Sequence, residues 1–144
     1  MRRQDKYPDT DTFHYFNANP KNRITEDCAV RAISVACEKP YNQVVMDLAE
    51  IQCQTGYDGS GKQGIDLLMK KYGWVMHKQP RKSDGRKYTG SEFCKKVATD
   101  NERYLANVGG HHIVAIVDCK IWDMWNSTGG CIGNYWTKDK WLEQ

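Results

Sequence analysis

The chain has 144 residues, a length typical of one domain with a hydrophobic core of its own. Its formal net charge of +3 is too small to indicate nucleic-acid binding by itself. No apolar run is long enough for a transmembrane helix, so we expect no membrane span. The basic amino terminus lacks the apolar segment that a signal peptide needs.

Cysteine usage indicates a reducing compartment. The chain has six cysteines, but they are scattered, three of them fall in helical patterns, and no secretory signal precedes them. We therefore expect free thiols and a cytoplasmic location. There is no CxxC spacing and no pair of histidines at zinc-finger intervals, so no metal is expected. No cofactor is expected either.

Residues 1–24 are polar and interrupted by prolines, which indicates a surface arm, with a candidate edge strand at residues 12–16. Residues 25–144 are expected to form a single domain. Periodicity and end signals predict helices at 25–37, 40–56, 63–72 and 90–99, and strands at 74–77, 103–108, 113–117, 121–125 and 134–137. Helices precede an antiparallel sheet, which is the pattern of an α+β protein.

The first long helix carries Cys28 in its first turn. Thr25 and Asp27 are both suitable N-cap residues, and an apolar face includes Ala29 and Ile33. The helix dipole at this end favours a thiolate, the reactive form of cysteine. The alternative is that Cys28 is a small buried apolar residue.

Residues 109–126 read GGHHIVAIVDCKIWDMWN and predict a β-hairpin. Strands joined by a two-residue turn pair at a constant index sum, here about 237 or 239. Either register puts His112 and Asp123 on one face and His111 on the other. A histidine oriented by a carboxylate is a suitable general base for a nucleophile such as Cys28. The alternative is a purely structural pair.

Two motifs support this combination. Asp27-Cys28-Ala29-Val30-Arg31-Ala32 opens the helix, and the hairpin contains Gly110–Asp118 followed by Trp122-Asp123-Met124-Trp125. Over residues 22–137 the chain resembles small papain-like cysteine peptidase domains of phage and bacterial genomes. The resemblance implies a papain-like α+β fold, in which a helix bearing the nucleophile at its N-terminus packs on a C-terminal antiparallel sheet.

The same resemblance implies that Cys28 is the nucleophile, His112 the base, and Asp123 the residue that orients His112. The sequence departs from the family pattern at two places. Cys119 stands at the hairpin turn where a glycine is expected, and no glutamine shortly precedes Cys28 to stabilise an oxyanion. Asn22, together with the backbone N–H of Cys28, is the available substitute.

These residues lead us to expect a cysteine hydrolase that cleaves a peptide or other amide-containing substrate through an acyl-enzyme. His111, Trp122 and Trp125 are candidate residues of the substrate cleft. One alternative is acyl or peptidyl transfer to an amine by the same triad. Another is a non-catalytic binding module with an aromatic cleft built from Trp122, Trp125, Tyr135 and Trp136.

Residues 78–88 form a basic, turn-rich segment that allows two interpretations. It is either a solvated loop or a loop beside the site that contacts an acidic ligand. The glycine-rich segment at residues 57–62 lacks the spacing and the preceding strand of a phosphate-binding loop.

Overall fold

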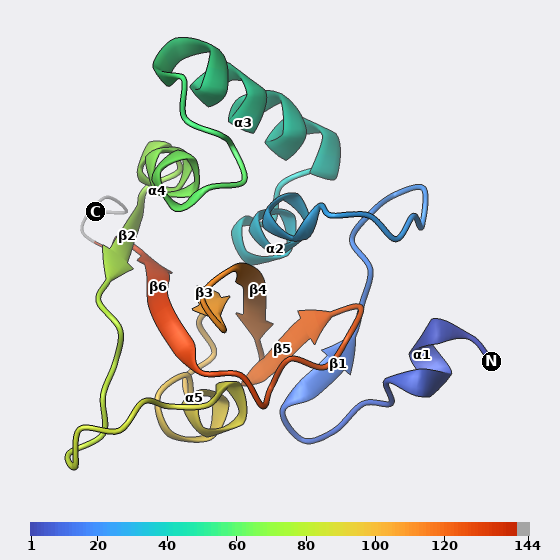
Figure 1. Cartoon of the computed structure of the whole chain (residues 1–144), viewed down its shortest axis with the longest axis vertical. Helices are drawn as coiled ribbons and strands as arrows, with labels where there is room; N and C mark the ends of the chain where they lie inside the picture. The colour runs from blue at the N-terminus through green and yellow to red at the C-terminus, as the bar shows by residue number, and fades with distance from the viewer. Residues whose placement is uncertain (141–144) are drawn as a thin grey trace.

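The structure, a computed structural model, describes residues 1–140. Its helices are α1 (Arg3–Lys6), α2 (Cys28–Cys37), α3 (Tyr41–Thr55), α4 (Lys62–Lys71) and α5 (Gly90–Lys96). Its strands are β1 (Phe13–Tyr15), β2 (Trp74–His77), β3 (Tyr104–Val108), β4 (His112–Val117), β5 (Lys120–Asp123) and β6 (Ile132–Lys138). The predicted α+β class is confirmed. Helices α2, α3 and α4 lie on one side of the sheet and α5 on the other (Figure 1).

The six strands form one sheet in the order β1-β5-β4-β3-β6-β2. Every neighbouring pair is antiparallel except β1 and β5, which are parallel, so the sheet is mixed rather than antiparallel as expected. The parallel edge strand comes from the segment expected to be a surface arm, within residues 12–16. Phe13 is fully buried there. By pairing with β5, the segment covers the edge that this strand would otherwise expose.

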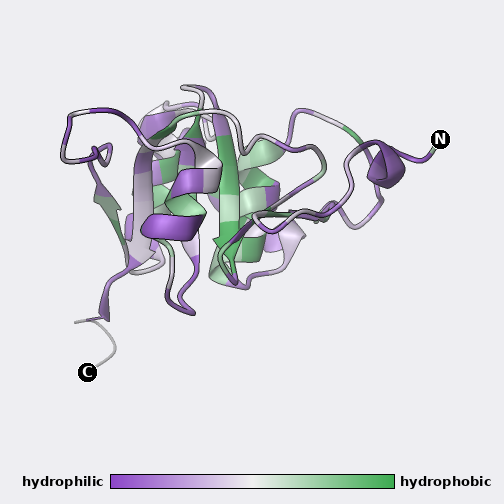
Figure 2. Cartoon of the chain, turned by 90° about the horizontal axis from the view of Figure 1, so that it is seen from below, coloured by the Kyte–Doolittle hydropathy of each residue, from purple (hydrophilic) through white to green (hydrophobic). Residues whose placement is uncertain are grey.

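Alternation along β4 divides the core into two layers. Ile113 and Ala115 pack with the buried residues of α2, α3 and α4, whereas Val114 and Ile116 pack with Phe93 of α5. A strand that is apolar on both faces must be covered on both faces. Hydrophobic residues accordingly follow the central strands, and hydrophilic residues dominate the outer loops (Figure 2).

Helix α2 packs directly against β4 through a face of small and branched residues. Ala29, Ile33 and Ala36 are buried, as the sequence pattern predicted. Asp27 occupies the N-cap position, but its side chain makes no capping hydrogen bond, because its carboxylate has other partners described below. The helix therefore begins at Cys28, with that residue in its first turn as expected.

The β4–β5 hairpin has the predicted register in which the index sum of paired residues is the smaller of the two values. Ala115 pairs with Trp122 and Val117 pairs with Lys120, so the index sum is 237. Asp118 and Cys119 form the two-residue turn with φ values of 52° and 62°. Positive φ at both positions is what a hairpin turn that matches strand twist requires. Cys119 thus replaces a glycine without changing the faces of His112 and Asp123.

All six cysteines are free thiols. Within residues 1–140, no helix has both the length and the apolar character needed to cross a membrane. The same part of the chain contains no group of three histidine, cysteine or acidic side chains arranged to hold a metal ion.

Candidate active site

Cys28 lies at the first position of α2 and is partly buried. Burial raises the pKa of its thiol, but contacts with the His112 side chain and the Ile113 backbone outweigh that effect and lower the pKa. The positive charges of His112 and Arg31 act in the same direction. The thiolate of Cys28 is therefore favoured relative to an ordinary thiol.

His112, the first residue of β4, connects Cys28 to Asp123. Its Nε2 atom lies 2.5 Å from Oδ2 of Asp123. Burial disfavours the charged ring, but hydrogen bonding to Asp123 and to Cys28 raises the pKa of His112 to about 9. Because Nε2 is engaged by Asp123, Nδ1 is the nitrogen left for the thiol. The lowered pKa of the thiol and the raised pKa of the imidazole both favour the thiolate–imidazolium pair over the neutral pair.

Asp123 ends β5 and is almost completely buried. Its Oδ1 atom accepts hydrogen bonds from Nη1 of Arg31 at 2.6 Å and from the backbone N–H of Met124 at 2.7 Å. The other oxygen faces His112. Three donors therefore fix the orientation of this carboxylate, which in turn fixes the ring of His112.

Arg31 is a member of the site that sequence reasoning missed. It is 5% exposed, and its guanidinium bridges Asp123 to Asp27, whose Oδ1 lies 2.7 Å from Nε. The sequence motif that begins at Asp27 includes Arg31, but the motif alone gives the side chain no role. The available signal was an arginine beside the apolar face of a core helix, four residues after an aspartate, because a buried arginine requires charge partners.

Asp27 is held by three side chains. Besides Arg31, the Tyr41 hydroxyl donates to its Oδ2 at 2.6 Å, and Nδ2 of Asn19 donates at 3.0 Å. Burial raises the pKa of Asp27, but these hydrogen bonds outweigh it and keep the pKa below its usual value. Asp27 thus stays charged and balances Arg31. The network runs from Asp27 through Arg31, Asp123 and His112 to Cys28, and acidic and basic groups alternate along it.

The three predicted cleft residues have different positions. The ring of Trp125 lies over His112, with centroids 4.8 Å apart and planes inclined by 40°. His111 is exposed and lines two cavities. Trp122 lies elsewhere: it packs against His14 and Phe16, and its indole N–H donates to the carbonyl of Val117. The sequence already indicated this position, because Trp122 and Asp123 are adjacent in a strand and their side chains point to opposite faces of the sheet.

Asn22 is not brought to the thiol. It is exposed, its backbone N–H donates to the Asn19 carbonyl, and its Oδ1 accepts from Asn17 at 3.4 Å. Among residues 1–140, no hydrogen bond joins Asn22 to Cys28 or His112. The backbone N–H of Cys28 remains available to an acceptor, since N–H groups in the first turn of a helix lack intrahelical acceptors.

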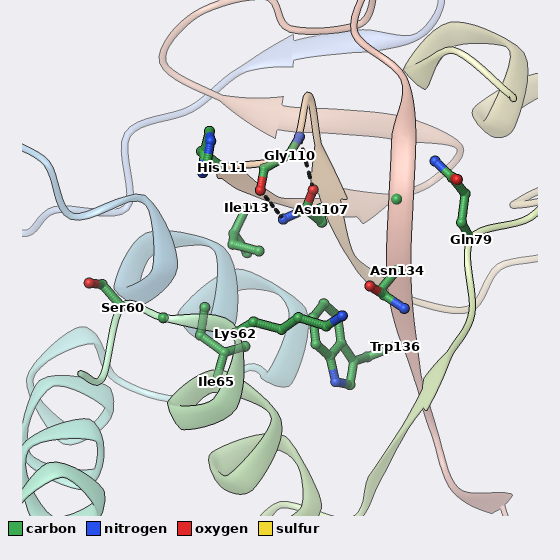
Figure 3. Close-up of a pocket in the computed structure, with 12 residues that line it drawn as sticks. Ser60, Lys62, Ile65, Gln79, Asn107, Gly110, His111, Ile113, Asn134 and Trp136 are labelled. Atoms are coloured by element: carbon green, nitrogen blue, oxygen red, sulfur yellow. Dashed lines mark hydrogen bonds between the residues drawn. The ribbon is translucent and has the colours of Figure 1, made fainter. Parts of the chain in front are cut away.

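Two cavities flank the histidine pair. The larger, of about 430 Å³, lies between the start of α4 and the sheet and is lined by His111 and Ile113 (Figure 3). The smaller, of about 310 Å³, is lined by His111, His112, Trp125 and Ser127. The Ser127 hydroxyl is buried and has no hydrogen-bond partner among the described residues. Both sides of the candidate site can therefore accept part of a ligand.

No protein-family model, curated protein or solved structure matches the chain. The functional assignment consequently depends on the geometry of the site itself.

Proposed function

We propose that the protein is a papain-like cysteine hydrolase that cleaves an amide bond, in a peptide or a related substrate. One observation carries the proposal: the side chains of Cys28, His112 and Asp123, from three different elements, form one interacting chain. A nucleophile, a base in contact with it, and a third group that orients the base are the requirements for nucleophilic acyl transfer.

In the proposed reaction the Cys28 thiolate attacks the substrate carbonyl carbon, forming the C–S bond. The backbone N–H of Cys28 is placed to stabilise the negative oxygen that results. His112 gives its proton to the leaving nitrogen as the C–N bond breaks, which leaves a thioester on Cys28. His112 then takes a proton from water, the resulting hydroxide attacks the thioester, and the thiol is regenerated.

Acyl or peptidyl transfer to an amine is the second candidate. The observation that favours it is the cavity of about 310 Å³ beside His112, which has room for an acceptor next to the base. An amine bound there would lose its proton to His112 and attack the thioester in place of water. Partition of a preformed acyl-enzyme between water and an added amine distinguishes the two reactions.

Selective alkylation tests the proposal without a known substrate. Brief treatment with substoichiometric iodoacetamide at pH 7, followed by mass mapping, should label Cys28 at least about tenfold faster than the other thiols. Cys53 and Cys131 are the matched controls, because both are more exposed than Cys28. The variant His112→Ala should remove the advantage. Labelling of Cys28 no faster than that of Cys53 would refute the nucleophile.

A second measurement separates an enzyme from a binding module. Cys28→Ala removes the sulfur atom while preserving the cleft, so it should abolish turnover and retain ligand. Biological activity that survives in Cys28→Ala would mean that the cleft works by binding alone.

A further inference from the structure

The larger cavity has walls that are fixed by close packing. A Cβ atom added at Gly64 would lie 2.4 Å from the carbonyl oxygen of Asp58, so the loop before α4 rests directly on the helix. A Cβ atom at Gly133 would lie 3.1 Å from Oδ1 of Asn107, where the β3–β6 pairing shifts register. This cavity of about 430 Å³ therefore lies between two closely packed walls.

The proposed chemistry indicates which part of the substrate each cavity would hold. Ile113, whose backbone contacts the Cys28 thiol, lines it, whereas His112 lines the smaller cavity. Since His112 must protonate the leaving nitrogen, the leaving group lies on the side of the smaller cavity. The larger cavity consequently faces the acyl part of the substrate, which carries the attacked carbonyl.

The lining of the larger cavity is polar, and its one fixed charge is positive. None of its twelve lining residues, all within the described part of the chain, is acidic. Lys62 makes no ion pair with any of residues 1–140. Its side chain extends along the cavity with the amine directed toward Asn134 (Figure 3). A lysine in this position is available to an incoming anion.

Charged side chains of both signs lie behind the lining. Nη2 of Arg81 lies 3.2 Å from Oε1 of Gln79, a lining residue, and within residues 1–140 Arg81 has no carboxylate partner. Lys82 and Arg86 in the same loop are instead paired with Glu92 and Asp84. Two carboxylates also contact lining residues: Asp58 accepts from Ser60, and Asp66, which is paired with Lys70, accepts from Trp136. Lys62 is therefore the charge that lines the cavity itself, and Arg81 lies directly behind its wall.

We propose that the larger cavity binds the carboxylate of an acidic residue on the acyl side of the substrate, with Lys62 as its ion-pair partner. This inference rests on the proposed hydrolase function and supplies its specificity. A glutamine has the same shape as glutamate but lacks the charge, so the difference between them isolates the ion pair. At a solvent-accessible site we expect a preference of about fivefold for glutamate, and discrimination against lysine.

Two sets of three active-site probes test the proposal. They are short peptidyl acyloxymethyl ketones that differ only in carrying Glu, Gln or Lys, first at the residue bearing the ketone and then at the preceding one. The Cys28 thiolate displaces the carboxylate leaving group and forms a stable thioether, so the rate of mass increase reports binding. We expect the order Glu, Gln, Lys for the wild-type protein, with a preference that declines as salt is added.

Variants assign the preference to one residue. Lys62→Met should make the Glu and Gln probes equal, and Lys62→Glu should make the Lys probe the fastest. Lys71→Met is the matched control, because Lys71 lies on the same helix beside Glu50 and does not line the cavity. A glutamate preference that persists in Lys62→Met would overturn the role of Lys62.

The two proposals fail in different ways. If Cys28 is selectively alkylated by iodoacetamide but the Glu and Gln probes react equally at both positions, the acidic specificity is wrong and the hydrolase proposal stands. If Cys28 shows no selective alkylation, the hydrolase proposal fails, and the specificity inference fails with it.

Discussion

Arg31 and Asp123 form an ion pair that is buried on both sides, with Nη1 2.6 Å from Oδ1 and side chains that are 7% and 2% exposed. The pair joins α2, which carries Cys28, to β5, which ends at Asp123. Asp123 therefore has two functions, since one oxygen holds His112 and the other holds Arg31. The fold and the candidate site therefore share the same carboxylate.

Removal of Arg31 should strongly destabilise the fold. Arg31→Met leaves Asp27 and Asp123 buried without their shared cation, and loss of one partner from a buried ion pair costs about 3–5 kcal/mol. Urea denaturation followed by circular dichroism measures the free energy of unfolding. Arg86→Met is the control, because Arg86 pairs with Asp84 on the exposed surface and should change stability by less than about 1 kcal/mol. Equal effects of the two substitutions would contradict a structural role for Arg31.

Asp123→Asn should impair activity more than it impairs folding. Arg31 and the Met124 N–H both donate to Oδ1, so the asparagine oxygen is required there and its NH₂ group turns toward Nε2 of His112. The ring then carries its proton on Nδ1 and cannot accept the proton of the thiol. The equivalent change in serine proteases costs about 10⁴-fold, so we expect about 10²–10⁴-fold slower labelling of Cys28 by iodoacetamide.

Circular dichroism provides the control for Asp123→Asn, whose spectrum should match the wild type. Asp123→Ala removes both hydrogen-bonding oxygens and should lose stability as well as reactivity. A rate for Asp123→Asn within about threefold of wild type would show that His112 needs no acceptor at this position.

Reactivity should depend on pH in two directions. The pKa of Cys28 is lowered, so alkylation should reach its plateau at a lower pH than that of a peptide thiol. The pKa of His112 is raised to about 9, so hydrolysis should decline above that pH as the proton for the leaving group is lost. Since the two groups titrate as a pair, a bell-shaped profile of kcat/KM is expected. A profile that keeps rising beyond about pH 10 would exclude His112 as the acid.

The same shift of His112 has a consequence for stability. Its folded-state pKa of about 9 exceeds the ordinary value of 6.5, so the folded protein binds this proton more tightly than the unfolded chain. The resulting stabilisation is complete below pH 6.5 and is lost as the pH rises through about 9. Denaturation of wild type and His112→Gln at about pH 6 and at about pH 9.5 should therefore give a smaller difference at the higher pH.

The two tryptophans of the hairpin provide a matched pair of substitutions. Trp125 covers His112, whereas Trp122 packs against His14 and Phe16. Trp125→Ala should expose the His112–Asp123 hydrogen bond to water and slow Cys28 labelling by about tenfold, since water competes for such bonds. Trp122→Ala should alter stability and leave the labelling rate unchanged. Equal labelling rates in the two variants would show that the Trp125 ring does not protect the site.

The positions of His112, Asp123 and Cys28 within their strands and helix could be predicted from local sequence patterns. Period-two alternation and a two-residue turn placed His112 and Asp123 on one face, and the observed pairing of Ala115 with Trp122 confirms the register. N-terminal helix signals placed Cys28 in the first turn of α2. These features depend on residues that are close in sequence, where backbone geometry leaves few alternatives.

Long-range partners were not predictable in the same way. The contact of Arg31 with Asp123 joins residues 92 positions apart, and no local pattern reports such a separation. The same reason applies to the parallel pairing of β1 with β5, because a strand of three residues carries no signal of its partner or direction. Asn22 was predicted as an oxyanion donor because it is close to Cys28 in sequence. In the structure it lies in a turn, with φ of 52°, and its side chain is exposed to solvent.

The pairing of Phe13 with Ile121 has a consequence for the order in which the candidate site is assembled during synthesis. On the ribosome, the segment containing Phe13 and Cys28 emerges first, long before its partners in β4 and β5 have been translated. Until then Cys28 lacks its contacts with His112 and Ile113, and its thiol is an ordinary one. The contacts that lower the pKa of Cys28 form only when the hairpin has been made and has docked against α2.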